Sequence, residues 1–343
     1  MQIINGLTSL ETGGNELFER GCIATIGVFD GVHIGHFSVI NRVVANARDR
    51  SLAPTVVTFA SHPKEELRGR APATVTSLEH RLRLFERVGV ELVLVLEFNA
   101  ALRQLSAEQF LRNHLLPQLG VRGLVMGFDS KFGHGRGGTL ESLRPLAKEL
   151  GLELEEVAPL RMGKRAVSST AVREAVSLGE LSRAASMLGR PVAMLGTVIH
   201  GDGRGSQLGF PTANLDPHHE LQPPDGVYAA FAQIGKLDAE NAEQLHPAVV
   251  NLGSRPTFGA EESSPEAHLL DFSGDLYGRT MELHFIKHLR ATEKFDDVDA
   301  LTTQLKKDVV EARTIIASAH QTWRIPGRYL PIEGSRLEDF LNS

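Results

Sequence analysis

Residues 27–36 of the chain read Gly27-Val28-Phe29-Asp30-Gly31-Val32-His33-Ile34-Gly35-His36. The apolar run before them, Cys22 to Ile26, is typical of a buried strand, and residues 37–50 after them have apolar side chains at helical spacing. The two histidines therefore lie where a strand ends and a helix begins. Backbone N–H groups at a helix start favour anions such as phosphate, and imidazoles there can donate hydrogen bonds to phosphate oxygens. The stretch predicts a phosphate-binding site, against the alternative of a surface turn with two unrelated histidines.

Strand and helix patterns alternate from residue 22 to about residue 177. After the first strand and helix, strands are predicted at 54–59, 91–98, 121–126 and 152–157. Helices are predicted at 77–88, 106–119 and 140–150, and a last one begins at Ser168. Such alternation implies a parallel sheet with helices on both faces, in which ligands bind at the carboxyl ends of the strands. His33 and His36 lie at one of those ends.

The pattern changes after a short predicted helix at 181–188, which Gly189-Arg190-Pro191 ends. Short strand patterns without helices between them follow at 192–199, 226–234, 248–252, 267–272 and 281–289. They predict an antiparallel barrel or sandwich. A long helix at 297–320 closes this part, with one apolar face made of Val298, Leu301, Leu305, Val309 and Ala312. We expect domains at 1–188 and 189–320, and assign no fold or role to the tail, 321–343.

The composition predicts a globular protein of the cytoplasm. The chain has 343 residues, enough for two domains, and its formal net charge of −6 gives no basic field for nucleic acid. Its single cysteine, Cys22, cannot form an internal disulfide, which favours a reducing compartment. Neither a signal-peptide pattern at the N-terminus nor an apolar run of membrane-spanning length is present. We therefore expect neither a nucleic-acid nor a membrane partner.

A second stretch with the chemistry of phosphate binding follows the last strand of the alternating part. Ser168, Ser169 and Thr170 put hydroxyl groups at a predicted helix start, and Arg173 follows about one turn later. Hydroxyls, free N–H groups and a guanidinium in this order are suited to a polyphosphate clamp. A plain Ser/Thr N-cap is the other interpretation.

Residues 201–214 form a third candidate stretch, which is rich in glycine. The backbone N–H groups of such a loop can cradle phosphate. Thr212 and Asn214 put a hydroxyl and an amide oxygen on one side if the segment is extended, and these are hard ligands suited to Mg²⁺. The Gly-Lys-Ser/Thr of a P-loop is missing, so the composition alone is also typical of a plain turn.

Several of these segments resemble a known family. The spacing His33-x-Gly35-His36 resembles the signature of the nucleotidyltransferase superfamily, and the whole stretch 27–36 resembles the start of bacterial bifunctional riboflavin kinase/FAD synthetases. Residues 209–214, Gly-Phe-Pro-Thr-Ala-Asn, are similar to the riboflavin kinase signature. Further similar segments occur in family order within about residues 15–313: 127–133, 168–173, 226–228, 251–253, 256–258 and 275–278. The resemblance implies an α/β Rossmann-like nucleotidyltransferase domain with a parallel sheet, then an antiparallel riboflavin kinase β-barrel with a C-terminal helix.

The resemblance also implies roles for individual residues. At the first site it makes His33 and His36 catalytic, and it assigns ATP and phosphate binding to Gly27, Phe29, Gly35, Ser168, Ser169, Thr170 and Arg173. It assigns the flavin and nucleotide pockets to His62, Asp129, Phe132 and Asn251. At the second site it makes Glu266 the catalytic base and Thr212 and Asn214 ligands of Mg²⁺, with phosphate-binding glycines at Gly201, Gly203, Gly205 and Gly209.

Two positions depart from the pattern of the family. Ser130 stands where the family usually has Phe, and Ser61 where it usually has Pro. An aromatic side chain buries more area and can stack on a ring, so Ser130 is expected to loosen the FMN pocket. Ser130→Phe is then expected to lower the KM for FMN.

The implied enzyme phosphorylates riboflavin to FMN with ATP and then adenylylates FMN to FAD, with Mg²⁺ as the metal. One alternative is an adenylyltransferase or tRNA-charging enzyme that shares only the first site, but a basic RNA surface and a Lys-Met-Ser-Lys-Ser-like loop are not seen. A non-catalytic flavin-binding or regulatory protein is another, against which the retention of Glu266, Thr212, His33 and His36 argues. The expected partners are small-molecule substrates, and a weak or transient homo-oligomer is left open.

Overall fold

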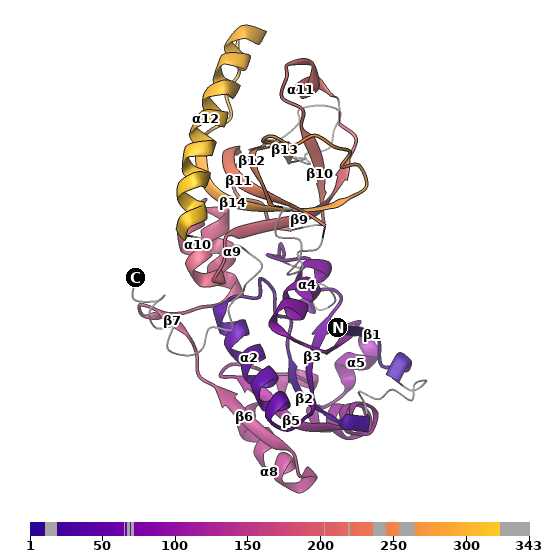
Figure 1. Ribbon diagram of the computed structural model, residues 1–343. Helices are drawn as coiled ribbons and strands as arrows, with labels where there is room; N and C mark the ends of the chain where they lie inside the picture. Colours follow the sequence, from indigo (N-terminus) through magenta and orange to yellow (C-terminus); the bar gives the residue numbers. More distant parts are fainter. Residues whose placement is uncertain are drawn as a thin grey trace. The chain divides into compact units, whose positions relative to one another are not determined.

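A computed structural model describes residues 1–10, 19–64, 66, 69, 72–201, 203–218, 220–235, 245–253 and 265–322 (Figure 1). The described residues form two compact units. Of the described residues, the first contains Met1–Thr74 and Leu78–Ser169, and the second contains Val75–Ser77 and those from Thr170 to Thr322. The division falls at the start of the helix that begins at Ser169, whereas the sequence predicts a boundary at residues 188 and 189.

A parallel sheet forms the centre of the first unit, as predicted. Its described strands are β1 (Gln2–Asn5), β2 (Cys22–Ile26), β3 (Ala53–Phe59), β4 (Leu92–Leu96), β5 (Val121–Gly127) and β6 (Glu153–Val157). They are six in number, lie in the order β1-β4-β3-β2-β5-β6, and are parallel to their neighbours. β1 is an addition to the predicted strands, because four residues are too few to establish a period.

Helices cover both faces of this sheet. They are α2 (Ile34–Asp49), α4 (Leu78–Val88), α5 (Ala100–Gln104), α6 (Ala107–Phe110), α7 (Leu116–Leu119) and α8 (Leu140–Leu150). α2 buries Val39 and Val43 against Ile23 of β2 on one face. On the other face, Phe110 of α6 and Leu143 of α8 belong to a second apolar cluster. The predicted alternation of sheet and helices is therefore confirmed.

Two local features of the first unit follow from its sequence. A capping box begins α6: the Oγ of Ser106 accepts from the N–H of Gln109 at 3.1 Å, and the Gln109 side chain accepts from the N–H of Ser106 at 2.9 Å. The predicted helix after it consists of α6, a π-helical turn (Leu111–Leu115) and α7. Cys22 is buried in β2, and this burial raises the pKa of its thiol to about 12.

The second unit contains a closed antiparallel barrel. Of the two folds predicted from the strand pattern, the barrel is therefore confirmed and the sandwich excluded. Its described strands are β9 (Val192–Ile199), β10 (Ala213–Pro217), β11 (Gly226–Ile234), β12 (Leu245–Leu252), β13 (Glu266–Leu269) and β14 (Thr280–Arg290). They close in the order β10-β13-β12-β11-β14-β9. Tyr228 and Phe285, both fully buried, meet edge to face with 5.4 Å between their ring centroids. Large side chains thus fill part of the core.

The remaining helices of this part are α9 (Ser169–Ser177), α10 (Leu181–Leu188), the single turn α11 (Arg204–Gln207) and α12 (Val298–Thr322). Ala312 and Ile316 of α12 pack on the outer face of the barrel with Val227 of β11. The predicted long helix is present as α12, and its apolar contacts with the barrel come from Val309 onward, whereas Val298 at its start is 59% exposed.

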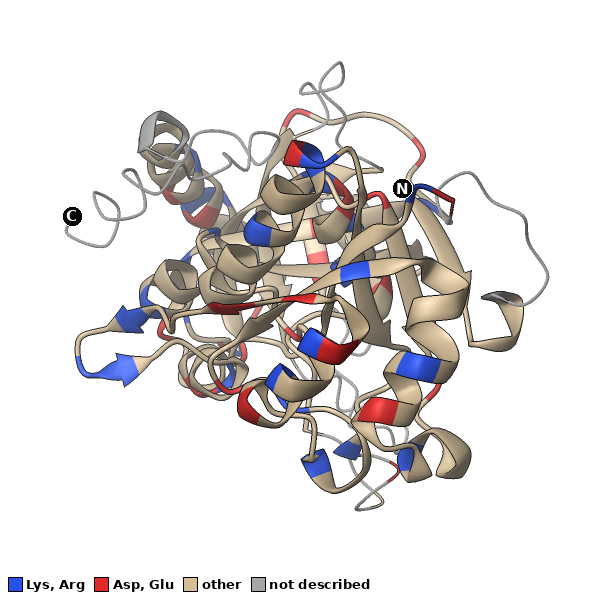
Figure 2. Ribbon diagram, turned by 90° about the horizontal axis from the view of Figure 1, so that it is seen from below, with Lys and Arg blue, Asp and Glu red and all other residues tan. Residues whose placement is uncertain are grey.

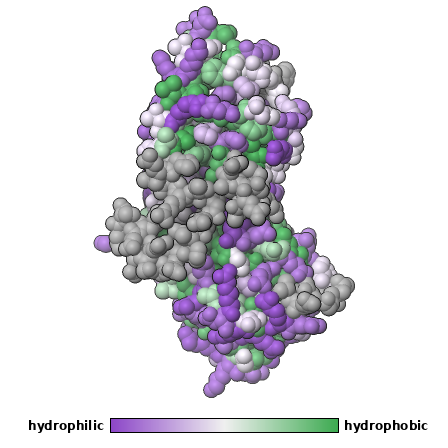
Figure 3. All heavy atoms as spheres, in the orientation of Figure 1, coloured by the Kyte–Doolittle hydropathy of each residue, from purple (hydrophilic) through white to green (hydrophobic). Residues whose placement is uncertain are grey.

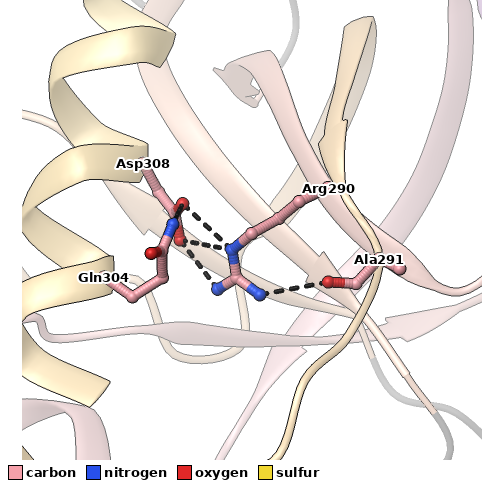
Figure 4. Close-up of polar contacts among 4 residues, drawn as sticks. All are labelled: Arg290, Ala291, Gln304 and Asp308. Atoms are coloured by element: carbon pink, nitrogen blue, oxygen red, sulfur yellow. Dashed lines mark hydrogen bonds and ion pairs between the residues drawn. The ribbon is translucent and has the colours of Figure 1, made fainter. Parts of the chain in front are cut away.

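An ion pair fixes α12 to the end of β14 (Figure 4). Nε and Nη2 of Arg290 donate to the carboxylate of Asp308 at 2.8–3.1 Å. Gln304 donates to the same carboxylate at 2.8 Å, and Arg290 Nη1 donates to the carbonyl of Ala291 at 3.1 Å. Asp308 is buried, and these donors supply hydrogen bonds to its carboxylate oxygens.

Lys and Arg are interspersed with Asp and Glu along the described chain, as the coloured ribbon of Figure 2 shows. On the face drawn in Figure 3, hydrophilic residues cover most of the described surface, and hydrophobic residues lie in smaller groups between them. No helix among the described residues is both long and apolar enough to cross a membrane.

Candidate active sites

The first candidate site lies at the junction of β2 and α2. His33 is the N-cap of α2, and its Nδ1 accepts a hydrogen bond from the backbone N–H of His36 at 3.2 Å. A ring nitrogen that accepts from an N–H carries no proton, so the proton of the neutral ring is on Nε2. His33 can therefore donate a hydrogen bond from Nε2 beside the N-terminus of α2.

The two imidazole rings are held as a stack. The centroids of the His33 and His36 rings are 3.6 Å apart, and the rings are inclined by 18°. Gly35 allows this stack, because a Cβ at that position would lie 3.2 Å from the His33 ring. The ring of Phe29 stands edge-on to His36 at 5.2 Å and to Phe85 at 5.8 Å. Phe29, predicted to bind ATP, thus supports His36 from the core.

A buried arginine of α4 holds the loop between β2 and α2. The guanidinium of Arg81 donates to the carbonyl of Val28 at 2.5 Å and to the carbonyl of Phe59 at 3.0 Å. It also donates to Thr58 Oγ1 at 3.1 Å, and this hydroxyl donates to the carbonyl of Val28 at 3.2 Å. The bonds join the carboxyl ends of β2 and β3, from which the site is built.

The start of α9 contacts the same loop. Ser169 is the first residue of α9, and its Oγ donates to the carbonyl of Asp30 at 2.9 Å. The predicted phosphate-binding residue Ser169 is thus joined to the loop that leads to His33. Thr170 and Arg173 follow in α9, which confirms the predicted helix but leaves their ligands a prediction.

A cavity of about 570 Å³ opens at the carboxyl ends of β2, β3 and β4. Part of its wall is apolar, from Phe59, Leu96, Phe98, Phe110 and Phe132. Cationic side chains line it as well: Lys64, Arg103, Lys131 and Arg136. Three of the residues assigned to the first site lie in this wall, namely Gly27, His62 and Phe132.

Two other residues near the end of β5 are placed differently. Asp129 is exposed, and it is not among the described residues that line the cavity. Ser130 turns back on its own strand, where its Oγ accepts from the N–H of Gly127 at 3.1 Å. The next two residues, Lys131 and Phe132, line the cavity. The structure thus gives no support to the expectation that residue 130 shapes the FMN pocket.

The second candidate site is a row of polar side chains across β10, β13 and β12. Glu266 stands opposite Asn214 of β10 on one side and opposite Asn251 of β12 on the other. Directly opposed residues project from the same face of a sheet, so the carboxylate lies between the two amides. Thr212 lies two residues before Asn214, at the entry to β10. Asp202 and residues 256–258 lie outside the described residues.

Two glycines of the 201–214 stretch make room for these side chains. A Cβ at Gly201 would lie 2.0 Å from the Asn214 amide, and a Cβ at Gly205 would lie 3.2 Å from Thr212 Oγ1. Gly203 and Gly209 instead have positive φ angles of +68° and +84°, which favour glycine. Their predicted contact with phosphate remains a prediction.

The chain has close relatives over most of its length. A family model of FAD synthetase matches residues 16–171, and one of riboflavin kinase matches residues 188–316. The chain is 34% identical to the bifunctional riboflavin kinase/FMN adenylyltransferase of Haemophilus influenzae, over 93% of this chain and 100% of that protein. It is 36% identical to the Escherichia coli K12 protein of the same name, over 91% of this chain and 97% of that protein.

The chain belongs to the bifunctional riboflavin kinase/FMN adenylyltransferase family. It is also similar to a crystal structure described as a macrolide-efflux protein from Streptococcus pneumoniae, with a TM-score of 0.78 and 30% identity. This similarity covers 91% of the chain and 99% of that protein. The His33–His36 site lies within the FAD synthetase match, and the Glu266 row lies within the riboflavin kinase match.

Membership in the family bears out the predicted enzyme class and fold. Sequence reasoning did not single out two residues next to the candidate sites, Arg81 and His268. Arg81 lies three and four residues before the buried Leu84 and Phe85, so a cation on the apolar face of α4 was the available signal. His268 lies two residues after Glu266 in β13 and therefore on the same face of that strand.

Proposed function

We propose that the chain makes FMN from riboflavin and ATP at the Glu266 row, and FAD from FMN and a second ATP at the His33–His36 site. The observation that carries this proposal is the alignment of Glu266 between Asn214 and Asn251 in one unit, with a capped histidine pair in the other. In this proposal, each unit catalyses one of the two reactions and binds its own ATP molecule.

In the adenylylation step, a phosphate oxygen of FMN attacks the α-phosphorus of ATP. A new P–O bond forms as the bond to the pyrophosphate oxygen breaks, and pyrophosphate leaves. The attacking oxygen is already anionic, so no strong base is needed and catalysis is mostly positioning and charge stabilisation. His33 donates from Nε2 to the developing charge, and the aromatic wall of the 570 Å³ cavity accommodates the flavin ring.

In the kinase step, the ribityl hydroxyl of riboflavin attacks the γ-phosphorus of ATP and ADP leaves. A hydroxyl is a poor nucleophile, and Glu266 takes its proton as the P–O bond forms. The hydroxyl of Thr212 and the amide oxygen of Asn214 would hold Mg²⁺ together with ATP phosphates, and the metal would supply charge stabilisation. The described residues contain no group of three or more His, Cys, Asp or Glu side chains that could hold a metal ion.

The other expectations form part of the same proposal. We infer a cytoplasmic enzyme with small-molecule partners and without nucleic acid, and a weak or transient homo-oligomer is left open. The formal net charge of −6 supports the absence of nucleic acid. The family models leave residues 172–187 between them, and α10, all but its last residue in this segment, belongs to the second compact unit. A kinase fragment that keeps α10 is therefore expected to fold better than one that starts at residue 189.

Incubation of the purified protein with riboflavin, ATP and Mg²⁺, followed by chromatography of the flavins over time, tests the proposal. FMN is expected first and FAD after it, and a chelator of divalent metals is expected to stop the formation of FMN. Absence of any phosphorylated flavin from a folded protein would contradict the proposal.

A further inference from the structure

His268 lies in β13, the strand that carries Glu266, and contacts the segment that leads to Thr212 and Asn214. The ring Nδ1 of His268 lies 2.8 Å from the backbone oxygen of Pro211, in the peptide that leads into Thr212. A carbonyl only accepts hydrogen bonds, so Nδ1 carries the proton and donates it. On the same ring, Phe210 makes an edge contact with 5.5 Å between centroids and an interplanar angle of 69°.

This hydrogen bond begins where backbone pairing ends. In the described register of β10 and β13, Ala213 pairs with Ala267 and Asn214 pairs with Glu266. The next antiparallel step would set Thr212 opposite His268, but the pairing stops before it. Pro211 has no N–H to extend the ladder. The imidazole thus makes the next connection between the two strands, one residue from Thr212.

We propose that His268 is a positioning residue of the kinase site, which fixes Thr212 relative to Glu266. This proposal rests on the proposed roles of Thr212 as a metal ligand and Glu266 as the base. Glu266 and His268 project from the same face of β13, so the strand that carries the base also sets the position of the Pro211–Thr212 peptide. A displacement of about 1 Å between reacting groups can cost about 100-fold in rate, so this connection bears on turnover.

Two polar replacements test the proposal, because they differ in where they place an N–H. The amide nitrogen of His268→Asn comes close to the position of Nδ1 and keeps the donor, whereas that of His268→Gln reaches toward the position of Nε2 and loses it. We expect the kinase kcat/KM for Mg²⁺–ATP to fall about tenfold in His268→Gln and to stay within about threefold of the parent in His268→Asn. FAD formation from added FMN and the unfolding midpoint by circular dichroism are expected to match the parent in both variants. Equal kinase kinetics of the two variants, or the reverse order, would overturn the proposal.

A double-mutant cycle with Thr212→Val tests whether His268 acts through Thr212. Thr212→Val alone is expected to raise the KM for Mg²⁺–ATP, and adding His268→Gln to it is expected to cause little further loss. A full additional tenfold loss would overturn the link to Thr212 and leave the kinase assignment intact. Parent kinetics of Thr212→Val alone would contradict the metal-ligand role on which the proposed function relies, independently of the Asn and Gln comparison.

Discussion

The Nδ1 atom of His33 accepts a hydrogen bond from the backbone N–H of His36, so the imidazole caps α2 and the proton of its neutral ring is on Nε2. The second imidazole stacks on the first at 3.6 Å. The side chain of His33 thus has a structural task at Nδ1, and the proposed chemical task falls to Nε2. Substitutions can separate the two tasks.

His33→Asn is expected to keep the cap and lose the chemistry, because an Asn side chain accepts from the N3 backbone N–H but cannot replace Nε2. FAD formation from FMN should fall by about 100-fold or more, as for the loss of one donor to a transition-state oxyanion. His33→Ala should lose the same activity and, in addition, about 1 kcal/mol of unfolding free energy. Urea unfolding and initial rates measured on the same preparations check both parts. Equal stability of the two variants would show that the cap contributes nothing.

Arg81→Met is expected to slow adenylylation by about 10-fold to 100-fold without touching the kinase step. The change removes the donors that hold the carbonyls of Val28 and Phe59, so the loop before His33 loses its anchor. Arg83→Met is the matched control on the same helix, since Arg83 pairs with Glu79 along α4. Initial rates of FAD formation from FMN and of FMN formation from riboflavin provide the measurement. A similar loss in both variants would contradict the anchoring role of Arg81.

Ser130→Phe is expected not to lower the KM for FMN, in contrast to what the family pattern alone suggests. The Ser130 hydroxyl faces the N–H of Gly127, and the described cavity wall begins with the next residue, Lys131. Ser130→Ala, which removes the hydrogen bond without adding bulk, serves as the control. The KM for FMN in the adenylylation step is the measurement. A lower KM for the Phe variant alone would show that position 130 reaches the flavin.

Asp308→Asn is expected to destabilise the second unit by about 3–5 kcal/mol, because it leaves the Arg290 guanidinium partly buried without its anionic partner. Asp271→Asn is the matched control: it removes the carboxylate that pairs with Arg313 at the surface, where solvent screens the interaction. We expect the control to unfold at the parent urea concentration. A comparable fall of the unfolding midpoint in both variants would show that burial does not make the Arg290–Asp308 pair contribute more to stability than the surface pair.

The sequence was sufficient to predict elements whose signals are local. The strand at Cys22–Ile26, the glycines after it and the amphipathic helix beyond it lie within one short stretch, so the β2–α2 junction could be predicted. Closure of the barrel could not be predicted from the strand pattern and was implied only by the resemblance, because it depends on β9 pairing with both β10 and β14, which are far apart in the chain. The pattern of short strands was compatible with a sandwich as well.

The candidate site residues also divide into those with a local sequence signal and those without one. His33, Glu266 and Thr212 belong to short motifs, and a motif is visible without the fold. Arg81 and His268 act through backbone carbonyls of Val28 and Pro211, and no motif spans either pair. Gly201 is an intermediate case: a glycine-rich loop suggested phosphate binding, whereas the structure shows that a side chain there would collide with Asn214.

The central claim is that one chain carries two independent active sites, and the variant Glu266→Gln tests it most directly. This protein should be supplied with riboflavin in one reaction and FMN in another, each with ATP and Mg²⁺, and the flavins should be resolved by chromatography. We predict that FMN formation from riboflavin falls by about 100-fold or more, because the proton acceptor is gone, while FAD formation from FMN keeps the parent rate. A folded Glu266→Gln protein that fails to convert FMN to FAD would contradict the claim.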